Sequence, residues 1–500
     1  MPSSNPLEIP EILLQLALWV SARDHPACAR VSKAWYQVFV PLIWKSISWN
    51  MNCQRPPEAV QRHADLVKSL SISITTKKRP VPRFPNLKSL FLCYDQEHPR
   101  LVLDQPSIAA LRFHCLQPAL EPTLWDGLLG FHHLKALWMA NSKIHEKNIG
   151  TFWQLCTRLE KLYLANHIVG DNERLPSMEF PHVKELEITN LGTGEYGIIS
   201  LSVDFMQRCP SLTMCCWTAS KFEVGHIPRF TQLVAEKTWP ELRIVGIRFC
   251  DISVDDLSNI VRGMQHDISL NISYSPNTFT PSTMDLLRSR FSCLKVLVLT
   301  WGDRSVTCPM VQEVLSSCPS LQYFSATRID AALVAEGKPW VCLGLQVLDL
   351  DFSFDPSTTH FIQPLLFDQL ARLTRLQELY LRRKPLYGLR EGAPASPFHE
   401  ALDLTLENGL YKLSTLRSLR VINYGHSKQR MDDQEIDWIL EHWRRLKLIS
   451  GKLNAQKPET DKRLVEKLKR HGIETLAVDG VTKYQRWRTS FWQSWEQWVE

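Results

Sequence analysis

Apolar residues recur along this chain in a short pattern: one apolar residue, two variable residues, then two apolar residues separated by one variable residue. Clear copies begin at Leu87, Leu134, Leu159, Val183, Leu242, Leu294, Leu345, Leu376 and Leu416. Weaker copies begin at Val67, Ile108, Leu212, Leu321, Leu446 and Ile473. The end of each copy alternates with a period of two, which predicts a short strand with one side facing a core.

The segments before these strands predict helices. Residues 151–162 and 311–324 carry apolar residues three and four positions apart, as one face of a helix requires. Successive copies are mostly 20 to 31 residues apart, for example 159 − 134 = 25. Over roughly residues 60–480 this spacing resembles that of leucine-rich-repeat proteins. The resemblance implies an α/β leucine-rich-repeat solenoid, or horseshoe, in which stacked units bury one continuous core.

One interval is longer than the others. The step from Leu376 to Leu416 is 40 residues, which indicates an insertion. The Pro- and Gly-rich segment 382–397 is the predicted loop within it.

Residues 7–49 lie outside the repeat and predict three short helices. Pro10 and Glu11 suit the first turn of the first helix. An apolar stripe on it comprises Ile12, Leu13, Leu16, Trp19 and Val20. Ser32 is the predicted N-cap of the third helix, which carries Trp35, Val38 and Phe39 on one face. So small a unit buries little surface, and its excess of apolar residues indicates a partner site.

The stretches "IPEILLQL", "CARVSKAWY" and "PLIWKSI" resemble an F-box. Two departures are that His25–Pro26 stand where the family has two leucines, and that Glu11 follows Pro10 directly. The resemblance implies a surface for a Skp-type adaptor formed by Ile9, Pro10, Glu11, Ile12, Leu13, Leu16, Val31, Lys33, Trp35, Leu42 and Trp44. The alternative is a helical cap that closes the N-terminal end of the solenoid.

The two resemblances together imply a substrate-recognition subunit of an SCF-type ubiquitin ligase. The F-box would bind the Skp-type adaptor and through it the cullin, and the repeats would bind an unknown protein substrate. The predicted segments are an F-box at 1–49, a linker at 50–62, the solenoid at 63–480 and a Trp-rich helix at 481–500. The alternative function is a leucine-rich-repeat interaction scaffold without a ligase role.

Strand alternation also predicts where a substrate would bind. The residue between the last two apolar positions of each copy points away from the core. Candidate substrate-binding residues chosen in this way are Phe91, Trp138, Tyr163, Asp349, Tyr380 and Arg420. Aromatic residues are common at binding hot spots, but packing between neighbouring strands is an equal alternative for them.

Composition narrows the class of protein. The chain has 500 residues, and its net charge of +6 (58 basic minus 52 acidic) is too small to indicate nucleic-acid binding. The start of the chain lacks the features of a signal peptide, and no apolar run is long enough to span a membrane, so we expect a cytoplasmic or nuclear protein.

No catalytic motif is present, so we expect a non-catalytic protein without a cofactor. The 13 cysteines are scattered without a C-x-x-C pair, which favours small buried side chains over a metal site. Asp349 and Asp351 could bind a cation, but a solvated acidic pair is the commoner outcome.

The chain ends in an aromatic segment, residues 484–500. Trp487, Phe491, Trp495 and Trp498 are spaced by 4, 4 and 3 residues, so on a helix they form one stripe. The simplest interpretation is a helix that covers the last repeat, and the alternative is a helix that docks on a partner.

Overall fold

The structure is a computed structural model of the chain. It describes residues 6–20, 24–49, 57–73, 83–94, 102–105, 107–115, 122–140, 144, 146–165, 177–189, 202–218, 226–248, 252–265, 267–273, 279–299, 306–355, 357–381, 402–425, 427 and 429–476. The chain divides into two compact units, Met1–Leu233 (unit one) and Val234–Glu500 (unit two). The Trp-rich segment 481–500 lies outside the described residues.

The strands of unit one pair in parallel, each with the next along the chain. They are β1 (Ser46–Trp49), β2 (Ser69–Ser73), β3 (Ser89–Tyr94), β4 (Ala110–Cys115), β5 (Ala136–Ala140), β6 (Lys161–Ala165), β7 (Glu185–Thr189) and β8 (Met214–Thr218). The helices that accompany them are α4 (Pro57–Arg62), η2 (Ala64–Leu66), α6 (Pro122–Leu129), α7 (Glu146–Cys156), α8 (Ser202–Gln207) and α9 (Ile227–Ala235).

Unit two has the same arrangement. Its parallel strands are β9 (Ile244–Arg248), β10 (Ile268–Ser273), β11 (Leu294–Leu299), β12 (Tyr323–Asp330), β13 (Val347–Ser353), β14 (Glu378–Tyr380), β15 (Val421–Gly425), β16 (Leu448–Gly451) and β17 (Glu474–Leu476). Its helices are α10 (Val254–Gly263), α11 (Pro281–Arg288), α12 (Cys308–Ser317), α13 (Ala331–Glu336), α14 (Thr359–Ala371), η4 (Leu410–Thr415), α15 (Asp433–His442) and α16 (Pro458–Arg470).

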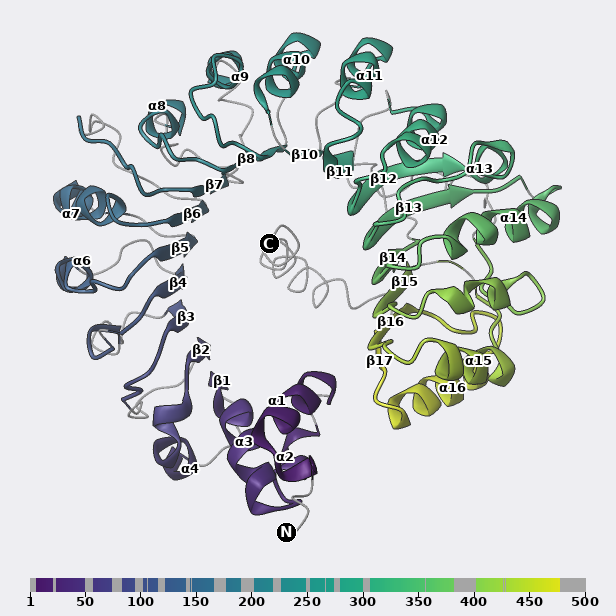
Figure 1. Ribbon diagram of the computed structural model, residues 1–500, viewed down its shortest axis with the longest axis horizontal. Coiled ribbons are helices and arrows are strands. Elements are labelled where there is room, and N and C mark those ends of the chain that lie inside the picture. The colour runs from purple at the N-terminus through teal and green to yellow at the C-terminus, as the bar shows by residue number, and fades with distance from the viewer. Residues whose placement is uncertain are drawn as a thin grey trace. The chain divides into compact units, whose positions relative to one another are not determined.

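Within each unit the helices lie on one side of the strands (Figure 1). The core lies between the two layers and takes the alternate strand residues, such as Leu162 and Leu164 in β6. Tyr163 between them points to the opposite side, which we call the inner face. Parallel strands in sequence order, each connected through a covering segment, confirm the predicted α/β leucine-rich-repeat solenoid.

The sheet of unit one begins earlier than the sequence pattern predicted. Strand β1 lies inside the segment 1–49, and Ile47 is buried opposite Leu70 of β2. The predicted linker at 50–62 contains helix α4. The residues "WKSISW" follow the repeat pattern, but they also form the end of the F-box resemblance.

Two predicted repeat frames were wrong. Glu378 pairs with Val421, so the copy that corresponds to Leu376 begins at Leu419 and not at Leu416. The sequence pattern pointed to Leu416 because this residue lies three positions before Leu419 and is itself apolar and buried. In the last copy, Leu476 lies opposite Ser450 and therefore faces the inner side, although the pattern predicted a core position. Strand β10 was missed because its copy begins with Asp267 in place of an apolar residue.

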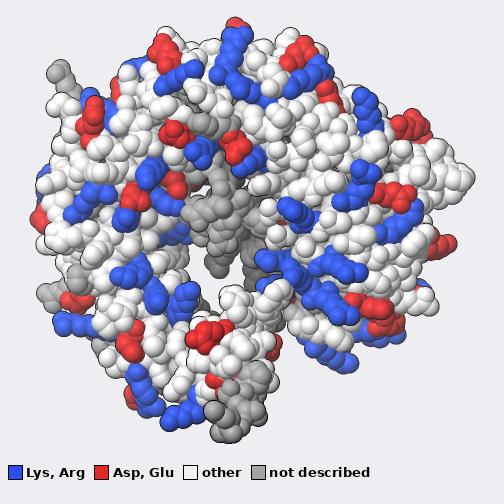
Figure 2. Space-filling view, in the orientation of Figure 1, with Lys and Arg blue, Asp and Glu red and all other residues white. Residues whose placement is uncertain are grey.

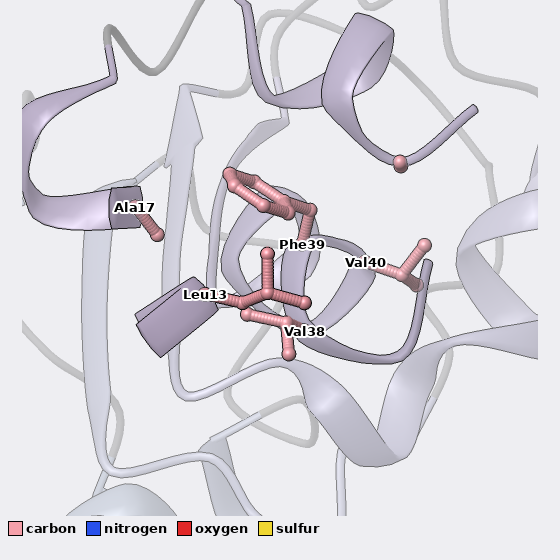
Figure 3. Close-up of a cluster of buried hydrophobic side chains, with 6 residues drawn as sticks. Leu13, Ala17, Val38, Phe39 and Val40 are labelled. Carbon is pink, nitrogen blue, oxygen red and sulfur yellow. The ribbon is translucent and has the colours of Figure 1, made fainter. Parts of the chain in front are cut away.

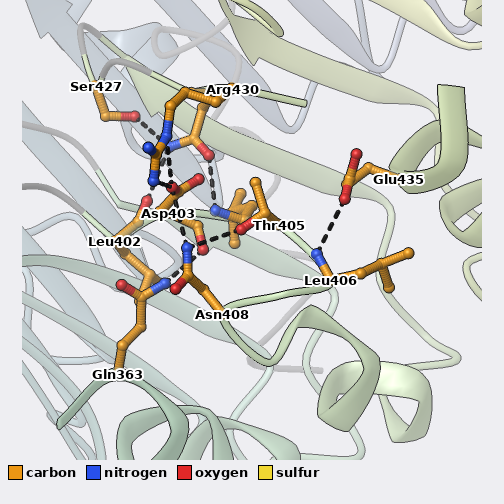
Figure 4. Close-up of polar contacts among 11 residues, drawn as sticks. Gln363, Leu402, Asp403, Thr405, Leu406, Asn408, Ser427, Arg430 and Glu435 are labelled. Carbon is orange, nitrogen blue, oxygen red and sulfur yellow. Dashed lines mark hydrogen bonds and ion pairs between the residues drawn. The ribbon is translucent and has the colours of Figure 1, made fainter. Parts of the chain in front are cut away.

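The insertion returns to the sheet through a polar network around residues 402–408 (Figure 4). Arg430 donates to Oδ2 of Asp403 from Nη2 at 2.6 Å and from Nε at 3.1 Å. Gln429 accepts from Leu404 N and donates to Leu402 O, both at 2.8 Å. The bonds of Gln429 satisfy backbone groups that would otherwise be buried without partners. Gln363 of α14 donates to Asp403 O at 2.5 Å, and Glu435 of α15 accepts from Leu406 N at 3.1 Å, so the segment is fixed against both helices.

Candidate functional site

The three N-terminal helices pack around a small core (Figure 3). They are α1 (Pro10–Trp19), α2 (His25–Cys28) and α3 (Lys33–Trp44), preceded by η1 (Pro6–Glu8). The buried side chains of this helical unit are Leu13, Ala17, Ala29, Val38, Phe39 and Val40. Pro10 stands at the first position of α1, as predicted. Ser32 caps α3, also as predicted, because its hydroxyl accepts from Trp35 N at 3.3 Å.

The residues predicted to bind an adaptor occupy different environments. Leu13 is completely buried and supports the unit from inside, so it does not lie on the predicted surface. Trp35 is half-buried: its ring stacks on Phe39 at 5.3 Å, and its Nε1 donates to Leu7 O at 2.9 Å. Trp44, also half-buried, stacks on His63 at 4.6 Å.

The other predicted residues divide by exposure. The half-buried ones are Ile9, Leu16 and Leu42, and the exposed ones are Pro10, Glu11, Ile12, Val31 and Lys33. The exposed group includes two apolar side chains, Ile12 and Val31. This small unit therefore leaves apolar side chains of the predicted set in solvent.

Further apolar side chains of the helical unit are exposed, although none of them belongs to the predicted adaptor-binding set. Leu14, Leu18 and Trp19 of α1 have 50%, 77% and 73% of their surface exposed, and Tyr36 of α3 has 50%. The predicted apolar stripe included Trp19, whereas the core takes Leu13 and Ala17 of α1. The sequence did contain a signal for these exposed residues, because α1 has more leucines than one face of a helix can bury.

A second group of candidate residues forms a row across the inner face of unit one. Phe91, Arg112, Trp138 and Tyr163 lie opposite one another on the adjacent strands β3 to β6. The rings of Trp138 and Tyr163 stack at 4.8 Å and 9°. The guanidinium carbon of Arg112 lies 5.0 Å from the Trp138 ring centroid and 5.7 Å from that of Phe91. We call these four residues the aromatic row.

Polar contacts hold one end of the aromatic row. The Tyr163 hydroxyl donates to Glu185 Oε2 at 2.8 Å, and Lys161 pairs with Glu185 Oε1 at the same distance. The stacked rings are thereby fixed before any partner arrives, which lowers the entropy lost on binding. Arg112 was not predicted because its copy of the repeat, from Ile108, is weak. Aromatic and arginine side chains together are typical of binding hot spots.

The predicted inner-face residues of unit two differ from this row. Asp349 has 2% of its surface exposed and accepts from Ser325 Oγ at 2.9 Å, so it is not a solvated acid. Tyr380 is buried and donates to Glu378 Oε2 at 2.6 Å. Arg420 precedes β15, and Asn423 takes the place opposite Tyr380 that was predicted for it. Phe91, Trp138 and Tyr163 are thus the predicted residues that the fold brings together.

Six of the described cysteines are buried, as predicted for small apolar side chains, whereas Cys28, Cys93, Cys293 and Cys308 are only partly buried. Those that are buried are Cys156, Cys209, Cys215, Cys216, Cys318 and Cys342. Burial raises the pKa of Cys342 to about 12, so its thiol stays protonated at neutral pH. In the part of the chain that the structure describes, no three His, Cys, Asp or Glu residues group as metal ligands would.

The distribution of charged side chains on the surface is consistent with the small net charge. On the face in view, Lys and Arg side chains are interspersed with Asp and Glu (Figure 2). No helix within the described residues is long and apolar enough to cross a membrane.

Comparison with known proteins gives distant structural similarities. No family model and no curated protein matches the sequence. Among known structures, 152 chains match. A leucine-rich-repeat protein of Leptospira interrogans has 13% identity and a TM-score of 0.32, with 91% of this chain and 98% of that chain covered.

Two further structures match over most of their length. One is from the complex of Rad7 and Elc1 in yeast, at 12% identity and a TM-score of 0.44, with 93% and 91% covered. The other is an internalin from Listeria monocytogenes, at 10% identity and a TM-score of 0.29, with 86% and 93% covered. Because these values are low, the assignment of the fold rests on the strand pairing and burial described above.

Proposed function

We propose that this protein is the substrate-recognition subunit of an SCF-type ubiquitin ligase. In this proposal the helical unit binds a Skp-type adaptor, the adaptor binds the cullin, and the inner face of the solenoid binds a protein substrate. The protein itself catalyses no reaction. Its contribution is to hold the substrate close to the transferring enzyme, which raises the effective concentration of the substrate.

The observation that carries the proposal is the exposed apolar surface of the helical unit. Leu14, Leu18, Val31 and Tyr36 remain in solvent although the unit has only a small core of its own. Exposed apolar side chains gathered on so small a unit are typical of a protein–protein interface. The F-box resemblance of the same residues points to a Skp-type adaptor as the partner.

For the substrate, the aromatic row offers the better-supported surface. Its side chains are only partly buried, and stacking already fixes their positions. Rigid aromatic side chains supply contact area at low entropic cost. We infer that a protein substrate contacts Trp138, Tyr163 and Arg112.

Co-purification of the adaptor with the full chain tests the adaptor role. Leu18→Glu should reduce recovery of adaptor and cullin at least about tenfold, since it places a charge in an apolar contact. The matched control is Leu365→Glu on α14, because Leu365 is an exposed leucine at 48% and lies in unit two. Neither substitution should lower the melting temperature.

The opposite outcomes are equally clear. If the wild-type chain recovers no adaptor under conditions in which another F-box protein does, the ligase role is wrong and an interaction scaffold is the better description. If L18E and L365E recover the adaptor equally well, α1 does not bind it. Trp35→Ala would not separate loss of the adaptor contact from loss of the fold, because Trp35 also packs on the core residue Phe39.

A further inference from the structure

Unit two contains apolar side chains that are buried on the inner face, away from its helices. Val347, Tyr380, Val421 and Leu448 have between 1% and 6% of their surface exposed, and Tyr323 and Leu476 pack against them. We call these six residues the inner-face cluster. They come from the adjacent strands β12 to β17, so the cluster crosses the sheet nearly perpendicular to the strands.

The described helices of unit two do not cover this cluster. Helices α10 to α16 lie on the other side of the strands, where they cover the core (Figure 1). In unit one, by contrast, the side chains of the aromatic row on the inner face are only partly buried. Buried apolar residues on the side without helices call for a covering segment of complementary chemistry.

The end of the chain is placed to supply that segment. Strand β17 is the last described strand, and its Leu476 belongs to the cluster. Another 24 residues follow Leu476 (500 − 476), and they carry Trp487, Phe491, Trp492, Trp495 and Trp498. Residues 477–483 can span at most about 25 Å when extended, which reaches any strand of the cluster.

The dimensions of the segment and the cluster agree. Residues 484–500 on a helix would be about 25 Å long at 1.5 Å per residue. Strands β12 to β17 are separated by five spacings of about 4.8 Å, or about 24 Å. The aromatic stripe from Trp487 to Trp498 would cover about 16 Å of this length, which matches the three strand spacings, about 14 Å, from β13 to β16.

We propose that residues 484–500 dock on the inner-face cluster of unit two, with the aromatic stripe against Val347, Val421 and Leu448. The chain then occupies part of its own inner face. Tyr380 is covered, and the aromatic row of unit one remains available to a substrate. This docking is independent of the adaptor role of the helical unit, so either proposal can fail without the other.

Photo-crosslinking within the full chain tests the docking. Phe491 is replaced by p-benzoylphenylalanine, the purified protein is irradiated, and the crosslinked peptides are identified by mass spectrometry after digestion. We expect crosslinks within one chain to peptides that contain Tyr380, Val421 or Leu448. Val421→Ser should reduce their yield about tenfold, as expected when one buried aliphatic contact is lost.

The control variant is Val298→Ser in β11, which is also buried on the inner face of unit two but lies outside the cluster. It should leave the crosslinks unchanged. Crosslinks to α16, crosslinks only between two chains, or crosslinks only to a co-purified protein would each overturn the proposal. They would indicate, respectively, an end cap, a second copy of the chain, or a partner. Equal loss in V421S and V298S would also overturn it.

Discussion

Glu378 shows how burial on the inner face changes the chemistry of one residue. Its carboxylate accepts from the Tyr380 hydroxyl at 2.6 Å and lies among buried apolar side chains. Desolvation raises the pKa of Glu378 above its ordinary value of 4.5, although the Tyr380 hydrogen bond and the charge of Arg420 oppose the shift. The folded protein therefore keeps this acid protonated to a higher pH than a solvent-exposed glutamate would be.

The sign of the pH effect follows from this shift. A raised pKa means that folded protein binds the proton more tightly than unfolded protein, so stability falls as the pH rises from 4.5 through the raised pKa. Glu378→Gln removes this loss and keeps an acceptor for Tyr380. We predict a higher melting temperature than wild type at pH 7 to 8, and equal melting temperatures below pH 4.5, measured by circular dichroism.

Glu160 provides the contrasting control for this prediction. Its hydrogen bond with Lys135 lowers the pKa of Glu160, so its ionised form is favoured in the folded state. Glu160→Gln should not raise the melting temperature at pH 7. A Glu378→Gln protein that melts below wild type at pH 7 would show that its carboxylate is stabilised as an anion.

Residue roles could be predicted where alternation decides them. Phe91, Trp138 and Tyr163 each stand between two buried apolar residues, and the structure places them in one row on the inner face. Leu13 and Leu14 could not be separated in the same way. A short helix with leucines on several faces leaves open which of them meets the core until α3 is packed against it.

At the scale of one repeat, the end of β16 depends on a glycine. Gly451 has a φ of +128°, and a Cβ added there would lie 2.3 Å from the buried ring of Tyr424. We predict that Gly451→Ala lowers the free energy of unfolding by about 2–4 kcal/mol, because both the backbone and the ring must move.

A glycine in unit one supplies the control. Gly150 lies inside α7, and a Cβ there would meet nothing within 4 Å. Gly150→Ala should stabilise the protein by about 0.5–1 kcal/mol, since alanine is the better helix former. Urea unfolding followed by tryptophan fluorescence measures both. If the two substitutions changed the free energy of unfolding in the same direction and by similar amounts, the conclusion that Gly451 has no room for a Cβ would be wrong.

The positions of strands could be predicted where the repeat keeps its apolar pattern. The copy at Leu376 gave the correct strand, whereas the insertion after it was anchored by Asp403, Gln429 and Arg430, polar residues that carry no periodic signal. The frame after the insertion was consequently chosen from Leu416 in place of Leu419. An apolar pattern predicts which side of a strand is buried, but it does not predict where the next strand begins after an irregular segment.

At the scale of the molecule, repetition makes stability a sum of local terms. Each strand pairs with its neighbours, so a folded repeat needs the next repeat or a cover over its exposed end. In unit one, α9 packs on the core side of β8. Trp217 of β8 is fully buried and makes an edge contact with Phe230 of α9, with ring centroids 6.1 Å apart.

We therefore predict that residues 1–236, which include all of α9, form a folded fragment with a cooperative thermal transition. A fragment of residues 1–218 should melt at least about 5 °C lower or aggregate, because removal of α9 exposes Trp217 and the apolar surface around it. Circular dichroism and dye binding compare the two. If the proposed adaptor role is correct, the longer fragment should also recover adaptor as well as the full chain does. An unfolded 1–236 fragment would mean that unit one depends on unit two for stability, contrary to an additive solenoid.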